Sequence, residues 1–199
     1  MIIKAITSFV RSLTSFNSPF DRYAYYQQDD ALSESAIRGM DLFFSEQLEC
    51  HHCHGGFNFS QASKHDFQAF AVSGFHNTGL YNDDGEGAYP SSDIGLKEIT
   101  LEPAHMGQFR APTLRNVAVS APYMHDGSVA TLEDVIAIYM AGGRGTGVDS
   151  PIKSPFMHGF ELKPEEQQDL LAFLESLTDE AFLNEPAFSD PWRTDASNP

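Results

Sequence analysis

The chain has 199 residues, of which 41% are hydrophobic and 12% aromatic, enough for one domain with a real core and an extension. Its formal net charge of −16 argues against nucleic acid and anionic membrane surfaces as partners. No apolar run is long enough to span a bilayer. The acidity permits a basic redox partner protein, although it equally describes a solvated surface.

The N-terminal residues 2–14 are predicted to form an amphipathic helix with one apolar face made by Ile2, Ile6, Phe9, Val10 and Leu13. Lys4 and Arg11 interrupt the apolar positions and no small-residue cleavage site follows, so this segment is not a convincing secretion signal. Asn17-Ser18-Pro19 is expected to end the helix, and an aromatic-rich connection follows it.

A second helix is predicted to begin after Ser33, which is a good N-cap residue, and to end near Glu46. Its buried side is expected to carry Ala36, Ile37, Met40, Phe43 and Phe44. Gly39 lies in the helix interior, where glycine costs about 1 kcal/mol relative to alanine. Close packing against another helix would explain a glycine at this position.

Both cysteines of the chain lie in Cys50-His51-His52-Cys53-His54, directly after the second helix. This C-x-x-C-H spacing is typical of covalent c-type haem attachment, in which two thiols bond the porphyrin vinyl groups and the imidazole binds iron. Cys50 and Cys53 are therefore the candidate thioether anchors, and His54 is the candidate proximal ligand. Zinc and a redox-active dithiol are weaker alternatives, because the chain has no other cysteine and no surrounding β-α-β pattern.

Residues 55–108 show little periodicity and many turn signals, yet they contain spaced aromatic and apolar residues. A stretch of this length without regular elements is usually functional or disordered. Its composition favours order, and a large flat cofactor would offer it an apolar surface to wrap.

Residues 109–127 contain three candidates for holding haem propionates. Arg110 and Arg115 are two of only 12 basic residues, and a guanidinium pairs well with a carboxylate. An ordinary ion pair with one of the 28 acidic residues explains either arginine equally well. His125 could bind metal, donate to a propionate or be a loop histidine.

Two further helices are predicted from their ends. Thr131 and Asp134 form a capping box, and Gly142-Gly143 ends that helix. The last helix begins at Pro164 and has an apolar stripe made by Leu170, Leu171, Phe173, Leu174 and Leu177. It is expected to cross the helix that precedes the haem motif. In the tail, Phe182, Phe188 and Trp192 are expected to contact the body.

Six stretches, considered together, are far more specific than C-x-x-C-H: residues 17–23, 38–44, 49–57, 75–81, 109–117 and 121–127. Through them nearly the whole chain resembles the C-terminal half of bacterial di-haem cytochrome c peroxidases, and more closely their MauG-like relatives. The opening and haem motifs are most similar to the MbnH-like subgroup, named after a methanobactin-associated enzyme that oxidises a protein tryptophan.

The resemblance implies a mainly α fold, in which a cytochrome c-like helical domain has long irregular loops that wrap one covalently bound haem. Residues 1–30 would be an inter-domain helix and connection, residues 31–180 the haem domain, and residues 181–199 a C-terminal tail. Haem c is attached outside the bacterial cytoplasm, so a periplasmic location is expected. The chain then reads as the later part of a longer precursor.

Members of the family carry two haem domains, of which the N-terminal one reacts with peroxide and the C-terminal one relays electrons. The resemblance therefore implies an electron-relay domain that exchanges oxidising equivalents with an N-terminal haem domain in the same precursor or a separate chain. No catalytic residue is expected in this half. A redox partner protein or a protein substrate would complete the system. The alternative is a free-standing mono-haem cytochrome c that only carries electrons.

The resemblance also implies a sixth iron ligand and a calcium ion. Alignment from Ser120-Ala121-Pro122 places the ligand on Tyr139, with Met140 as the alternative because adjacent helix positions point about 100° apart. Loop methionines are further candidates, namely Met106, Met124 and Met157. The carbonyls of Ser120 and Pro122 match positions that bind an inter-domain Ca²⁺ in the family.

Overall fold

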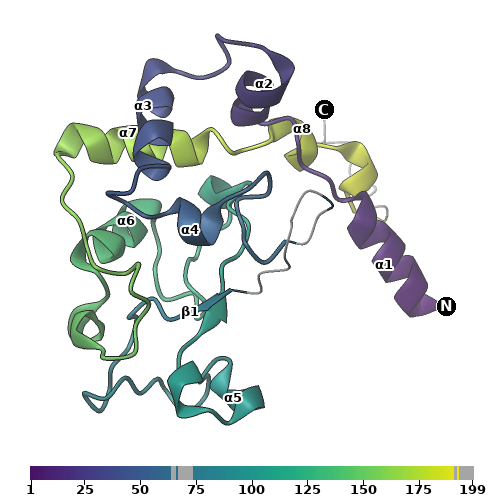
Figure 1. The fold of residues 1–199 in the computed structure, drawn as a ribbon. Coiled ribbons are helices and arrows are strands. Elements are labelled where there is room, and N and C mark those ends of the chain that lie inside the picture. Colours follow the sequence, from purple (N-terminus) through teal and green to yellow (C-terminus); the bar gives the residue numbers. More distant parts are fainter. Residues whose placement is uncertain (64–65, 67–73, 191, 193–199) are drawn as a thin grey trace.

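The computed structural model describes residues 1–63, 66, 74–190 and 192 (Figure 1). The α-helices within them are α1 (Ile2–Ser12), α2 (Pro19–Tyr26), α3 (Glu34–Phe43), α4 (His51–His54), α5 (Lys97–Thr100), α6 (Leu132–Ala141), α7 (Pro164–Glu175) and α8 (Glu180–Leu183). Short 3-10 helices are η1 (Pro103–His105), η2 (Val117–Val119), η3 (Gly145–Asp149) and η4 (Pro186–Phe188). Strands β1 (Phe75–His76) and β2 (Phe109–Arg110) pair antiparallel.

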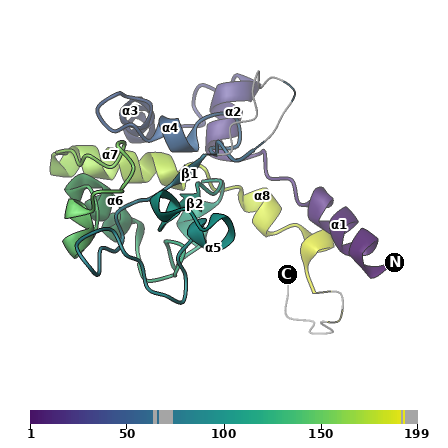
Figure 2. The same ribbon diagram turned by 60° about the horizontal axis from the view of Figure 1, so that its bottom comes forward.

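The expected mainly helical architecture is confirmed. Helices α3 and α7 pack across each other, and α6 lies beside α7 (Figures 1 and 2). The irregular segments with β1, β2 and α5 lie together away from the α3–α7 crossing. Part of the predicted irregular stretch 55–108, namely residues 64–65 and 67–73, lies outside the described residues.

The crossing of α3 and α7 depends on Gly39. A Cβ atom at this position would lie 1.8 Å from the backbone oxygen of Asp169 and 2.9 Å from Cβ of Phe173. The helix contact expected from Gly39 is therefore confirmed. In the preceding turn of α3, Arg38 donates two 2.7 Å hydrogen bonds to the Asp169 carboxylate, and Ser35 donates one of 2.6 Å. The bonds from Arg38 and Ser35 lower the pKa of Asp169.

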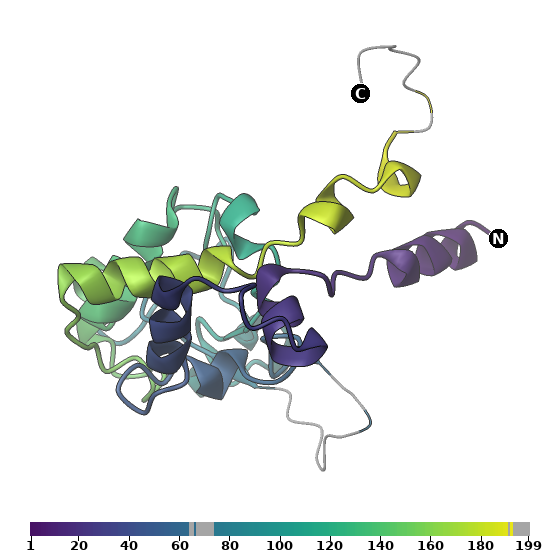
Figure 3. The same ribbon diagram turned by 90° about the horizontal axis from the view of Figure 1, so that it is seen from above.

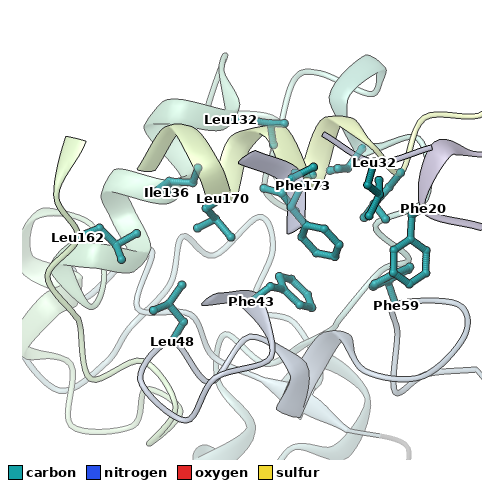
Figure 4. Packing of buried hydrophobic residues seen from close by; sticks show 14 residues of the cluster. Phe20, Leu32, Phe43, Leu48, Phe59, Leu132, Ile136, Leu162, Leu170 and Phe173 are labelled. Atoms are coloured by element: carbon teal, nitrogen blue, oxygen red, sulfur yellow. The ribbon is translucent and has the colours of Figure 1, made fainter. Parts of the chain in front are cut away.

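Aromatic rings fill the core under this crossing. The ring centroids of Phe43 and Phe173 are 5.1 Å apart, and those of Phe20 and Phe59 are 5.0 Å apart in an edge-to-face arrangement. Phe173 is fully buried and Phe59 is 1% exposed. Figure 4 shows these rings at one end of the cluster, with aliphatic side chains at the other, among them Leu48, Ile136, Leu162 and Leu170.

The starts of α3, α6 and α7 and the end of α6 were predicted correctly, whereas α3 ends at Phe43 rather than near Glu46. The sequence did not predict α2 or the short helices α4, α5 and α8. Ser33 accepts a hydrogen bond from the Ala36 amide, and α6 begins at the Thr131 cap and ends at Gly142. The expected aromatic-rich connection after Ser18 is wrong, because Pro19–Tyr26 forms α2. Ser18 and Asp21 form a capping box there, and proline is favourable at a first helical position.

Two predictions of aromatic burial are wrong. Phe44 was expected on the buried side of α3 but is 41% exposed, because α3 ends at Phe43 and the helical periodicity stops there. Trp192 is 85% exposed and does not hold the tail to the body.

Helix α1 and the C-terminal elements extend from the body (Figure 3). No residue of α1 is buried, so its predicted apolar face is exposed. The tail contacts it through Phe188, whose ring centroid is 6.2 Å from that of Phe9. No described helix is both long and apolar enough to cross a membrane. The predicted boundary at residues 30/31 stays a prediction, while Phe20 and Leu32 on either side of it belong to one core cluster.

We expect Gly39→Ala to lower the free energy of unfolding by about 1–3 kcal/mol or more, because the added methyl group overlaps the α7 backbone. Denaturant unfolding of the haem-loaded protein measures this loss. Asp41→Ala in the same helix is the matched control, since Asp41 is exposed and its replacement should be close to neutral. Equal stability of the two variants would show that the helices do not approach so closely.

Candidate haem-binding site

The two cysteines lie on one helical turn directly beyond the α3–α7 crossing. Cys50 precedes α4 and Cys53 lies within it, so their side chains project from the same face of the turn. Both are free thiols. Burial and the neighbouring Cys53 raise the pKa of Cys50 to about 12, and burial raises that of Cys53 to about 11. Both free thiols therefore keep their protons at neutral pH.

His54 is held in the orientation and tautomer of a metal ligand. Its Nδ1 lies 3.3 Å from the carbonyl oxygen of Phe59 and 3.1 Å from that of Pro112. Because a carbonyl oxygen can only accept, Nδ1 must carry the proton, and the lone pair is on Nε2. Burial lowers the pKa of His54, which keeps the imidazole neutral. A neutral imidazole whose second nitrogen is held by acceptors is the usual form of a metal-ligating histidine.

The β1–β2 pair brings two distant motifs of the sequence together. Phe75 lies opposite Arg110, and His76 opposite Phe109. His76 has a buried Nε2 without a hydrogen-bond partner among the described residues, and burial lowers its pKa. It also lies close enough to His54 for its charge to lower the pKa of that residue. The motif containing His76 was recognised from the sequence, but this residue was assigned no role, because nothing local connects positions 54 and 76.

The three predicted propionate partners lie in different environments. The exposed Arg110 lies over the Phe75 ring at 5.0 Å and forms no ion pair within the described part of the chain. Arg115 is buried, with Nη1 2.8 Å from the Asp21 carboxylate and Nη2 2.6 Å from the carbonyl oxygen of Phe57. Both of its Nη groups thus bond protein acceptors, and Arg110 is better placed for an external carboxylate.

His125 belongs to a cluster of rings around β2. Its imidazole stacks on Phe109 at a centroid distance of 3.8 Å and lies 4.0 Å from the Asp93 carboxylate. Burial lowers its pKa against the opposing effects of Asp126 and Asp93. Nearby, Tyr81 donates a 2.6 Å hydrogen bond to Asp126, which joins the motif at residues 75–81 to that at residues 121–127.

The structure distinguishes the two candidate sixth ligands by their surroundings. Burial, followed by the charges of Cys50 and Cys53, raises the pKa of Tyr139, so its hydroxyl lies near both haem cysteines. Met140 packs against the hydrophobic core instead. This difference favours Tyr139, and the assignment stays a prediction.

The predicted calcium positions lie on the surface. Ser120 and Pro122 are exposed, and neither carbonyl oxygen accepts a backbone hydrogen bond among the described residues. The two oxygens are thus available to a cation, and calcium here also stays a prediction.

The residues fit a covalently attached haem. Two reduced thiols, a histidine with its lone pair on Nε2 and a tyrosine near both sulfurs converge on one turn. Two surface hollows lie elsewhere, one lined by Phe16 and Phe188 and one by Ile136 and Leu171. The side-chain geometry of these residues therefore defines the site.

Comparisons with known proteins were made by sequence and by structure. No family model matches the chain. It is 35% identical over 201 residues to cytochrome-c peroxidase IdrP1 of Pseudomonas sp. (strain SCT). This alignment covers 94% of this chain and 50% of that protein. It is 34% identical over 178 residues to the methylamine utilization protein MauG of Methylophilus methylotrophus, with coverages of 88% and 46%. A solved structure of a MauG-like protein associated with microbial copper homeostasis matches with a TM-score of 0.91 and 50% identity, over 96% of this chain and 57% of that one.

The fold and site thus define a cytochrome c-like haem domain. The chain belongs to the family of bacterial di-haem cytochrome c peroxidases and MauG-like proteins. It is accordingly a haem protein of an oxidoreductase family. It spans about half the length of the curated relatives that it matches.

We expect Arg115→Met to lower the free energy of unfolding by about 3–5 kcal/mol, because it leaves the Asp21 carboxylate buried without its cation. The side chains of Arg115 and Asp21 are 5% and 1% exposed. Urea unfolding of the haem-loaded protein is the measurement. Arg22→Met in the same helix as Asp21 is the control, since Arg22 forms one exposed hydrogen bond and should cost no more than about 1 kcal/mol. A similar loss in both variants would contradict the structural role of Arg115.

Proposed function

We propose that this chain is the electron-relay haem domain of a MauG-like di-haem peroxidase or oxidase. Cys50 and Cys53 tether one haem c, and His54 and Tyr139 ligate its iron. The observation that carries the proposal is the pair of carbonyl contacts at Nδ1 of His54, which directs the remaining lone pair to a metal. Arg110 and His125 hold the propionates, and Arg115 supports the site through its pair with Asp21.

When bound, the haem supplies reversible one-electron chemistry, and the protein tunes it. Acceptors at Nδ1 of His54 raise the basicity of its other nitrogen. Burial raises the pKa of Tyr139, so this phenol keeps its proton unless a cation replaces it. A tyrosine ligand favours the ferric state, whereas a methionine ligand would raise the potential. The choice of Tyr139 therefore suits storage of oxidising equivalents.

The peroxide reaction belongs, in this proposal, to an N-terminal haem domain that is part of the same precursor or a separate chain. Support comes from the length of the relatives, about half of which this chain matches. A periplasmic location and a redox partner protein or protein substrate follow from the same assignment. Microbial copper homeostasis, with which the 50% identical relative is associated, is the proposed setting. Calcium at the Ser120 and Pro122 carbonyls would lie at the boundary between the two domains.

A free-standing mono-haem electron carrier is the second candidate function, because the chain contains a single C-x-x-C-H. Genomic sequence upstream of Met1 separates the two. An in-frame second haem motif supports the relay domain, and a stop codon directly upstream supports the carrier.

We expect one covalent haem c per chain after expression in a periplasm with cytochrome c maturation, because both thiols of the motif are reduced and adjacent. The pyridine haemochrome spectrum measures the type and amount of haem. A Cys50→Ala/Cys53→Ala variant should carry no covalent haem, and His158→Asn, at an exposed histidine, should keep it. Wild-type protein without covalent haem under these conditions would contradict both candidate functions.

We expect Tyr139→Phe to remove the sixth ligand of the ferric haem, since the hydroxyl lies near the cysteine sulfurs. The electronic and EPR spectra should change from six-coordinate to high-spin five-coordinate. Met140→Leu is the matched variant and should leave the spectra unchanged, because Met140 packs into the core. The opposite pattern would assign the ligand to Met140.

A further inference from the structure

A second group of metal-ligating side chains lies next to the haem motif. Nε2 of His51 is 3.6 Å from Oε1 of Glu46, and Nε2 of His52 is 3.5 Å from Oε2 of the same carboxylate. One ligand atom from each residue lies within 4.8 Å of the other two. Within the ranges that the structure describes, this is the one such group of three His, Cys, Asp or Glu residues.

The distances from the Glu46 carboxylate to the two imidazole nitrogens exceed those of ordinary hydrogen bonds. Hydrogen bonds from an imidazole nitrogen to an oxygen are normally about 2.7–3.2 Å long. Two ligands of a tetrahedral Zn²⁺ with bonds of about 2.0–2.1 Å lie about 3.3–3.4 Å apart. The 3.5 and 3.6 Å separations to Glu46 are close to this edge length. The Glu46 side chain is 79% exposed and can therefore move toward an ion held by the two imidazoles.

The surroundings hold the imidazoles and leave the carboxylate free to adjust. The His52 ring stacks on Phe156 with centroids 4.8 Å apart and planes 8° from parallel. The His51 and His52 side chains are 25% and 33% exposed, whereas Glu46 is 79% exposed. An ion could therefore reach the site from solvent and meet two oriented nitrogens.

Glu49 can serve as a fourth ligand. Its Oε2 lies 2.8 Å from Nε2 of His52, a hydrogen bond that an ion bound to this nitrogen would replace, and its side chain is 21% exposed. Neither Glu46 nor Glu49 pairs with a lysine or arginine in the part of the chain that the structure describes. The negative charge of the two carboxylates is thus available to a cation.

We propose that Glu46, His51 and His52, with Glu49 or water in the fourth position, form a binding site for a divalent transition-metal ion beside the haem. Two imidazoles and one or two carboxylates match the preferences of Zn²⁺ and Cu²⁺, whereas Mg²⁺ and Ca²⁺ prefer oxygen ligands alone. The site is separate from the haem iron, because His54 provides the proximal nitrogen. His51 and His52 lie between the two haem cysteines, so a bound dication would stabilise the reduced, less positive haem and raise its reduction potential.

Titration of the chelator-treated, haem-loaded protein with Zn²⁺ and, separately, with Cu²⁺ tests the site. Isothermal calorimetry and metal analysis after gel filtration should find one ion per chain. Glu46→Gln and a His51→Asn/His52→Asn double variant should each weaken binding tenfold or more. Haem content and near-ultraviolet circular dichroism confirm that each variant is folded.

His158→Asn and Glu161→Gln are matched controls, because both residues are exposed and lie outside the group. They should bind the ion as the wild type does. No binding by the wild type, or equal affinity in the Glu46→Gln and His158→Asn variants, would overturn the site. Calorimetry and metal analysis report ion binding whether or not the haem relays electrons, so failure of the proposed relay function would be recognised separately.

Spectropotentiometric titration tests the effect of the ion on the haem. Saturating Zn²⁺ should move the midpoint potential of the wild type to more positive values, and Glu46→Gln should show no shift at the same concentration. An unchanged wild-type potential with the ion bound would overturn the electrostatic coupling.

Discussion

The contact between Gly39 and the α7 backbone is the constraint on which the rest of the structure depends. It lets α3 and α7 approach until a side chain at this position would overlap the Asp169 oxygen. The hydrogen bonds from Ser35 and Arg38 to Asp169 then hold the two helices at this point. Because α3 leads directly to Cys50 through the buried Leu48, the crossing also positions the haem motif.

Backbone oxygens and buried charge complete the site from distant parts of the chain. The main-chain carbonyl oxygens of Phe59 and Pro112 select the His54 tautomer, so the side chains at these two positions take no part in that selection. The Arg115–Asp21 pair joins α2 to the segment that follows β2. Two arginines from one short motif thus have different roles. Arg115 is buried and pairs with Asp21, whereas Arg110 is exposed at the surface.

Structural features that depend on a local sequence pattern were predicted correctly. Features for which the same residues fit two different structures were predicted wrongly. The starts of α3, α6 and α7 and the end of α6 were predicted because caps act within a few residues. Helix α2 was missed because Ser18-Pro19 reads as a break, although serine followed by proline is also a good helix start. Phe44 and Trp192 are exposed, since an aromatic residue is buried only if the fold offers a surface opposite it.

The sequence by itself determined the cofactor motif, the family and most helix ends, because covalent haem attachment and helix capping depend on residues a few positions apart. Only the tertiary structure decided which side chains meet across long separations. The pairing of Arg115 with Asp21, the proximity of Tyr139 to the cysteines and the approach of His76 to His54 all have this origin. Even for Glu46, His51 and His52, which are close in sequence, the fold of the turn after α3 decides that their ligand atoms lie within 4.8 Å of one another.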